Sequence, residues 1–323
     1  MAKPIGILKA TPEDFVVQEL HRDPATPVTL CMQRSRVKGH NGGNVTTFAL
    51  TKRGWTTKDA VHQIARQLDV PLDCISAYGL KDKHAITSQI VGVEGNFIPF
   101  FFHEDMRLVQ IGETDRPLRN GAHVGNRFVI RIISDAPSID EDALRRVPNL
   151  FGKQRMGDPG NEVVGKLILE GDYDADGEML QQQPEGHVLK RVRESARSWK
   201  DALLCTEVRF SFGFAIQKWQ SHLWNTLLVE RMGGYVPERL PLWHTDSDIR
   251  SLYTHLWNPK HIDEEALRVV RRSFRPSFIN VTRLGVMQDG DAWRFTFDLA
   301  PGAYATVVLE QVFDLKENRK GRE

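Results

Sequence analysis

The chain has 323 residues, of which 41% are hydrophobic and 26% are charged, and its formal net charge is +1. This composition excludes a globally disordered chain, and the length suits one large domain or two smaller ones. A neutral chain also lacks the strong overall positive charge of a dedicated nucleic-acid-binding domain.

Neither secretion nor membrane insertion is predicted. The first twenty residues contain acidic residues and lack an apolar run of signal length, and no later stretch approaches the roughly 20 apolar residues of a membrane span. The three cysteines, Cys31, Cys74 and Cys205, are far apart and lack disulfide or zinc-ligand spacing. We therefore expect a cytoplasmic protein with reduced thiols, no bound metal and no membrane association.

The first half of the chain favours strands. Segments 15–20 and 45–51 are rich in β-branched and aromatic residues, and a helix is expected from Thr56 and Thr57 to Leu68. Two further strands, CISAYGL and AITSQIVGV, flank Asp82, which is therefore expected on a turn. Beyond them the sequence predicts a strand at 128–134, a short helix at 140–147, a loop at PNLFGKQRMGDPG and a helix at 161–170.

From residue 172 helices dominate, interrupted at DYDADGE and QQQPEG. Long helices are expected at 215–232 and 263–272, and strands return at SFINVTRLGV, AWRFTFDL and AYATVVLEQVF. The predicted fold is mixed α/β: a central, largely antiparallel sheet with flanking helices. Residues 1–171 and 273–323 would form this sheet domain, and 172–272 a mainly helical insertion.

Several familiar sites can be excluded by spacing. DYDADGE resembles the first half of an EF-hand loop, but Gln183 stands where a bidentate Glu is required. The chain also lacks a P-loop, a dinucleotide-binding fingerprint, an HExxH motif and a nucleophile elbow. A nucleotide-dependent enzyme is therefore disfavoured, and no cofactor is expected.

Asp82 is the remaining candidate for chemistry, because it lies between Lys81 and Lys83 in GLKDKHAITSQ. Nearby cations favour an ionised carboxylate, which suits a nucleophile or a base better than an acid. The hypothesis is that the lysines keep Asp82 charged, while the alternative from spacing alone is a solvated charge cluster.

GLKDKHAITSQ resembles the signature of the TruD family of pseudouridine synthases. Five other segments agree with the family, in the same order: ILKATPEDFVVQE, LRNGAHVGNRFVIRI, PNLFGKQRMG, QSHLWNTLLVERM and APGAYATVVLEQ, the last of them a strand in the family. The resemblance spans nearly the whole chain. It implies the pseudouridine synthase fold and the cofactor-independent isomerisation of uridine to pseudouridine in RNA, typically at uridine 13 in the D-arm of transfer RNA.

The resemblance also implies roles for individual residues. Asp82 would attack C1′ of the ribose or take a proton from C2′, and Lys9 would keep Asp82 ionised and oriented. Phe151 would support the flipped base, because an unstacked base rests on an aromatic surface. Asn149 and Gln89 would bind the uracil edge or brace their loops.

Other features leave alternatives open. Arg155 would bind phosphate or pair with an acid. Basic residues cluster at 34–40, 190–200 and 268–275, where they fit either an RNA-facing groove or solvated helix faces. Leu150 and Met156 depart from the aromatic residues of the family motif, and the insertion looks shortened. The alternative function is a noncatalytic RNA-binding or RNA-folding protein, and we expect a monomer.

Overall fold

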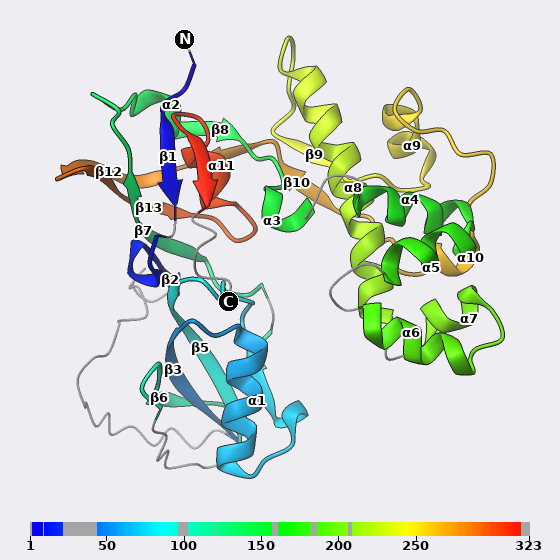
Figure 1. Cartoon of the computed structure of the whole chain (residues 1–323), viewed down its shortest axis with the longest axis horizontal. Coiled ribbons are helices and arrows are strands. Elements are labelled where there is room, and N and C mark those ends of the chain that lie inside the picture. The colour runs from blue at the N-terminus through cyan, green and yellow to red at the C-terminus, as the bar shows by residue number, and fades with distance from the viewer. Residues whose placement is uncertain are drawn as a thin grey trace. The chain divides into compact units, whose positions relative to one another are not determined.

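The structure is a computed structural model that describes residues 2–8, 10–21, 44–95, 103–119, 121–156, 161–181, 186–205 and 209–317. Lys9, Cys31 and the basic cluster at 34–40 lie outside these ranges. The chain divides into two compact units, Met1–Val147 with Ile279–Glu323, and Pro148–Phe278 (Figure 1).

The two units meet after Val147 and after Phe278, whereas the sequence predicted domain boundaries after residues 171 and 272. Helix α4 (Asn161–Glu170) contributes Val164, Ile168 and Leu169 to the hydrophobic core of the second unit. The segment from Pro148 therefore belongs with the helices that follow it.

The first unit is built on one large mixed sheet. Its main path runs β12-β13-β7-β2-β5-β3-β6, with β1 paired to β14 and β7, and β4 paired to β5. The ten strands are Ile5–Leu8 (β1), Phe15–Leu20 (β2), Val45–Arg53 (β3), Ile75–Ala77 (β4), Ile86–Glu94 (β5), Met106–Thr114 (β6), Gly125–Ile133 (β7), Thr282–Asp289 (β12), Ala292–Leu299 (β13) and Asp314–Glu317 (β14).

The pairing confirms the predicted fold class. Among the described strands of this sheet, only the β2–β5 and β1–β14 pairs are parallel, and the other pairs are antiparallel. Strand β2 has the predicted bounds, and β3, β5 and β7 lie where strands were expected. Segments from both ends of the sequence thus form one sheet.

Helix α1 (Thr57–Leu68) covers the β3–β5–β6 end of the sheet, as Figure 1 shows. The Thr56 side chain caps it by accepting a hydrogen bond from the Asp59 amide, as the sequence predicted. Buried Ala60 and Ile64 of α1 pack in one cluster with Phe48 and other apolar residues of the sheet. The start of α1 lies beside the turn between β4 and β5, because Oγ1 of Thr57 accepts a hydrogen bond from the Lys81 amide.

One prediction for the first unit is wrong and another is too long. The segment AYATVVLEQVF contains helix α11 (Ala305–Leu309) in place of a strand. Val307, Val308 and Leu309 are all buried, whereas successive residues of a strand point to opposite faces. The short helix expected at 140–147 is present as α2, but it covers only Asp142–Arg145 and is followed by strand β8 (Arg146–Pro148). Short 3-10 helices lie at Pro12–Asp14 (η1) and Leu72–Cys74 (η2).

The second unit is mainly helical. In addition to α4 it contains Lys153–Met156 (α3), Tyr173–Gln181 (α5), Gly186–Ser195 (α6), Trp199–Leu204 (α7), Arg209–Arg231 (α8), Ser247–Tyr253 (α9) and Glu264–Leu267 (α10). Within this unit Arg239–Pro241 (β9) pairs with Phe274–Pro276 (β10) in a two-stranded sheet. A second two-stranded sheet pairs β8 with Phe278–Asn280 (β11), and both of its strands span the boundaries between the units.

Here too the helix boundaries correct the sequence predictions. Helix α8 begins at Arg209, before the predicted 215, and α10 ends at Leu267, before the predicted 272. DYDADGE lies largely within α5, where a break was expected. Within the described residues, no helix combines the length and the apolar character needed to cross a membrane.

Close packing of α4 against α8 requires glycine at position 165. A Cβ there would overlap the carbonyl group of Ala215, which is backbone and cannot rotate away. Gly213 lies within α8 itself, and a Cβ there would meet nothing within 4 Å. The structure therefore has room for a Cβ atom at position 213 but not at position 165.

We expect Gly165→Ala to lower the free energy of unfolding of the second unit by about 1–3 kcal/mol, because overpacking forces the helices apart. Gly213→Ala should raise it by about 0.5–1 kcal/mol, because alanine favours a helix interior. Urea unfolding followed by tryptophan fluorescence measures both. Equal effects of the two substitutions would contradict the described α4–α8 contact.

Candidate active site

Asp82 lies on the turn between β4 and β5, as predicted, and its side chain is partly buried. We call residues 79–85 the Asp82 turn. The two flanking lysines occupy different environments, because Lys81 is nearly buried whereas Lys83 is exposed. Nothing in the local sequence distinguishes these two environments.

Lys81 binds a carboxylate at the end of β2. Its Nζ lies 2.6 Å from Oε1 of Glu19, and the exposed fractions of the two side chains are 6% and 0%. The other oxygen, Oε2, accepts a hydrogen bond of 3.0 Å from the Ile90 amide and lies 3.3 Å from Nε2 of His21. The ammonium group of Lys81 is therefore paired directly with Glu19, a partner that the sequence did not indicate.

Glu19 is ionised in this environment. Burial acts to raise the pKa of Glu19, but the contact with His21, the charge and hydrogen bond of Lys81 and the Ile90 amide together hold it below its ordinary value. The pair contributes stability above about pH 4.5 and loses it as the pH falls through the lowered pKa.

Gln89 braces the turn from within the sheet. It is fully buried, its Nε2 donates to the carbonyl oxygen of Gly79 at 3.1 Å, and its Oε1 accepts from Oγ1 of Thr57 at 2.9 Å. Oγ1 of Thr57 in turn accepts a hydrogen bond of 2.8 Å from the Lys81 amide. These contacts are the ones expected if Gln89 braces its loop.

Lys52 is a cation at the turn that the sequence analysis missed. Its side chain is buried, and Nζ donates to the carbonyl oxygens of Trp55 at 2.6 Å and Asp82 at 2.9 Å. A signal was present, because Phe48, Leu50 and Lys52 alternate along one strand, which places a lysine on the same face as two buried apolar residues.

The N-terminal motif is fixed on either side of Lys9, which itself lies outside the described residues. Strand β1 precedes it and η1 follows it. Oδ2 of Asp14 accepts hydrogen bonds from the amide and the hydroxyl of Thr11, at 2.8 and 3.3 Å. Oδ1 of Asp14 lies 3.8 Å from NH1 of Arg131 on β7.

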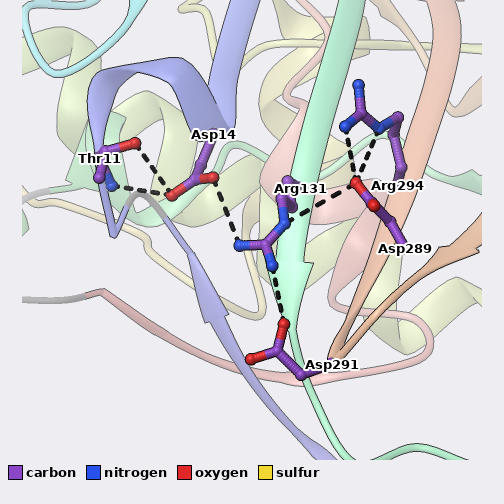
Figure 2. A network of polar contacts seen from close by, with 6 residues as sticks. All are labelled: Thr11, Asp14, Arg131, Asp289, Asp291 and Arg294. Atoms are coloured by element: carbon purple, nitrogen blue, oxygen red, sulfur yellow. Dashed lines mark hydrogen bonds and ion pairs between the residues drawn. The ribbon is translucent and has the colours of Figure 1, made fainter.

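Figure 2 shows how this contact continues into a network on the sheet. Arg131 also reaches Asp291, at 2.8 Å, and Asp289, at 3.9 Å. Asp289 is shared with Arg294, whose NH2 lies 2.6 Å away. The Pro-Glu-Asp-Phe segment is thus attached through Asp14 to β7 and to the β12–β13 hairpin.

In the second unit, Asn149 is held at both ends of its side chain. Nδ2 donates to the carbonyl oxygen of Pro276 at 2.9 Å, and Oδ1 accepts from NH2 of Arg275 at 2.6 Å. Nε of Arg275 also donates to the carbonyl oxygen of Asn149 at 2.8 Å. Because these residues are about 126 positions apart, no local pattern could have indicated this contact.

Phe151 lies among aromatic and cationic side chains. The side-chain amide of Asn225 binds the backbone of Phe151. Its Oδ1 accepts a hydrogen bond of 2.8 Å from the Phe151 N–H, and its Nδ2 donates one of 3.0 Å to the Phe151 carbonyl oxygen. Cζ of Arg275 lies 4.0 Å from the centroid of the Phe151 ring, and the Trp224 ring stands edge-on at 5.7 Å. Leu150, one of the two departures from the family motif, packs against the same apolar cluster as Phe151.

Arg155 lies on α3. Its NH2 donates to Oε1 of Gln217 at 2.6 Å, and its Cζ lies 4.6 Å from the centroid of the Phe214 ring. Of the predicted site residues, the first unit contains Asp82 and Gln89, and the second contains Asn149, Phe151 and Arg155. Asn149 and Phe151 are brought together by Arg275.

The unequal environments of the two flanking lysines give a direct test. Lys81→Met leaves Glu19 buried without its cation, so we expect the free energy of unfolding at neutral pH to fall by about 3–5 kcal/mol. The loss should shrink as the pH falls, because protonated Glu19 no longer needs a counter-ion.

Lys83→Met is the matched control, because its exposed side chain should change stability by less than about 0.5 kcal/mol. Urea unfolding followed by circular dichroism, repeated at several pH values, measures both variants. If Lys83→Met were as damaging as Lys81→Met, the described Glu19 contact would be wrong.

Known proteins resemble this chain along most of its length. The family model "tRNA pseudouridine synthase D (TruD)" matches residues 3–185. A "Probable tRNA pseudouridine synthase D" of Pyrococcus abyssi is 30% identical over 281 residues, covering 73% of this chain and 64% of that protein. A protein of the same name from Methanopyrus kandleri is 27% identical, and the match covers 96% of this chain and 95% of that protein.

The solved structures agree on the fold. The crystal structure of the putative tRNA pseudouridine synthase D of Methanosarcina mazei superposes with a TM-score of 0.62 at 18% identity, covering 97% of this chain and 94% of that one. The chain spans less than two thirds of the length of some curated relatives that it matches, such as those of Pyrococcus abyssi, at 64%, and Pyrococcus furiosus, at 63%. Because the family model extends from β1 through the Asp82 turn to the Phe151 loop and beyond, the chain belongs to the TruD family.

Proposed function

We propose that this chain isomerises uridine to pseudouridine in transfer RNA, at uridine 13 of the D-arm, with Asp82 as the reacting carboxylate. The observation that carries the proposal is the Asp82 turn, which lies inside the region matched by the family model. Lys81, Gln89 and Thr57 hold the backbone of this turn through buried contacts. Such support is what a reacting group needs in order to keep its geometry.

Two routes are open to an Asp82 carboxylate. In the first, an oxygen of Asp82 bonds to C1′ as the C1′–N1 bond breaks and the uracil leaves with the electron pair. After the base turns, C5 bonds to C1′ and releases the carboxylate. In the second, Asp82 removes the C2′ proton, C1′ and C2′ become doubly bonded as the uracil leaves, and C5 then adds to C1′ as the proton returns to C2′.

Both routes finish in the same way. The proton on C5 is lost and N1 gains one, so the atoms of the base and the sugar are conserved and no electrons enter or leave. The reaction therefore calls for no redox cofactor and no energy source. This is consistent with our expectation from the sequence that the protein uses neither a cofactor nor a metal.

The remaining predicted residues are assigned by the same proposal. Lys9 orients Asp82, Phe151 supports the flipped base, and Asn149, whose buried side-chain amide is bound by Pro276 and Arg275, braces its loop. Arg155 binds a phosphate, and Gln89 acts by bracing the Asp82 turn.

The first unit would be the catalytic domain and the second the insertion domain of the family. Basic residues at 190–200 and 268–275 of the second unit would contact the RNA backbone, which gives binding its dependence on salt. We propose that the protein acts as a monomer in the cytoplasm.

Tritium release tests the reaction, because isomerisation conserves mass but expels the hydrogen on C5. We expect the protein to release tritium from transfer RNA labelled at uridine C5, without cofactor or metal. Asp82→Asn should lower the rate by about 10²–10⁴-fold, because the neutral amide neither attacks C1′ nor accepts a proton. Asp73→Asn, which changes an exposed aspartate in η2, should release tritium at the wild-type rate.

The outcomes separate the parts of the proposal. Tight RNA binding without release would favour the noncatalytic RNA-binding alternative, and full activity of a folded Asp82→Asn variant would exclude Asp82 as the reacting group. Replacing uridine 13 by cytidine should abolish the release; continued release would overturn the position but leave the reaction intact.

Substitution of Phe151 tests its role separately. Stacking of a base on an aromatic ring is worth about 1–3 kcal/mol, so Phe151→Leu should lower kcat/KM by about 10- to 100-fold. Phe151→Tyr keeps the ring and should retain most of the activity. Single-turnover rates at several enzyme concentrations measure both; equal activity of the two variants would show that no ring is needed.

A further inference from the structure

Lys52 is an unusual residue to find inside a sheet. It lies on β3, its exposed fraction is 1%, and it is paired across the sheet with Thr87 of β5 and Met106 of β6, neither of which is charged. Burying an ammonium group strongly destabilises a protein unless its donors are satisfied.

The hydrogen bonds of Lys52 all go to backbone oxygens around the Asp82 turn. Nζ donates to the carbonyl oxygens of Trp55 at 2.6 Å, Asp82 at 2.9 Å and Lys81 at 3.4 Å. An ammonium group has three donors, and these contacts use each of them. A single buried group thus ties the end of β3 to two successive residues of the turn.

The charges around Lys52 come from the turn and from α1. The pKa of Lys52 is lowered to about 8: burial lowers it most, the Asp82 carboxylate raises it, Lys81 lowers it and Asp59 raises it. Below that pH Lys52 is therefore a buried cation that attracts the Asp82 carboxylate, while above it the attraction is lost.

We propose that Lys52 is a positioning residue for the Asp82 turn, which it holds through its hydrogen bonds to the backbone while its charge attracts the Asp82 carboxylate. The role rests on the proposed function, because it matters for turnover only if Asp82 reacts. It is distinct from the role of Lys81, whose ammonium group binds Glu19.

Two substitutions separate the hydrogen bonds from the charge. Lys52→Met removes both, and Lys52→Gln keeps amide donors without a charge. Lys58→Met, which removes an exposed cation at the start of α1, controls for the loss of one positive charge. Single-turnover tritium release at saturating enzyme reports the reacting step and excludes differences in RNA affinity.

We expect Lys52→Met to slow this step by about 10²-fold, because a displaced reacting group loses its alignment. Lys52→Gln should recover part of the rate. The wild-type rate should also decline as the pH rises through about 8, where Lys52 loses its proton, and neither Lys52 variant should show that decline. A purely structural role would change the rate without removing this dependence on pH.

A second readout does not require activity. The ¹³Cε resonance of Lys52 should titrate near pH 8 in the wild-type protein. In Asp82→Asn it should titrate at lower pH, because the carboxylate that raises the pKa of Lys52 is gone. The Lys58 resonance should not respond to this substitution.

The outcomes are decisive in either case. Wild-type rates and an unchanged alkaline decline in Lys52→Met would overturn the proposal, as would a Lys52 titration that is indifferent to Asp82→Asn. If Lys52→Gln had the wild-type rate and the wild-type pH dependence, the charge of Lys52 would have no role, and only its hydrogen bonds would position the turn. If the wild-type protein released no tritium at all, the proposed function would fail, while the resonance would still decide whether Lys52 and Asp82 are coupled.

Discussion

The ion pair between Glu19 and Lys81 is the constraint on which the candidate site depends. The parallel pairing of β2 with β5 runs from Val16↔Ile86 to Gln18↔Ser88. At the next residue of β2, the Glu19 carboxylate takes the Ile90 amide on one oxygen and the Lys81 ammonium on the other. The end of β2 is thereby joined both to β5 and to the turn that enters it.

A buried pair of this kind is weak evidence for stability, because desolvation offsets much of the attraction between its charges. Its effect is geometric. An apolar pair of similar volume would fill the same space, but it would not specify the position of the Lys81 backbone. With Lys52 bound to carbonyl oxygens of the turn and Gln89 bound to Gly79, polar contacts from β2, β3 and β5 converge on the backbone around Asp82. These contacts restrict the position of the backbone at Asp82.

The sequence allowed the framework of this site to be predicted but not its internal contacts. The bounds of β2, the capping of α1 by Thr56 and the placing of Asp82 between two strands follow from local patterns, because each depends on residues close in the chain. Lys81 and Lys83 look equivalent in sequence, and only the partner at Glu19, 62 residues away, distinguishes them. Likewise, the hydrogen bond from Arg275 to Asn149 joins residues 126 positions apart. Local patterning also failed for Ala305–Leu309, where tertiary packing determines a helix in a β-branched segment.

Two of the buried charges beside the turn, those of Glu19 and Lys52, also define a range of pH. Glu19 stays ionised down to its lowered pKa, below the ordinary 4.5, and Lys52 stays protonated up to about 8. Between these limits Glu19 is an anion paired with Lys81, and Lys52 is a second buried cation. The positive charge of Lys52 is buried, so salt screens it much less than it screens an exposed lysine such as Lys83. Part of the electrostatic environment of Asp82 is thus set by residues that solvent does not reach, because Glu19 and Lys52 are 0% and 1% exposed.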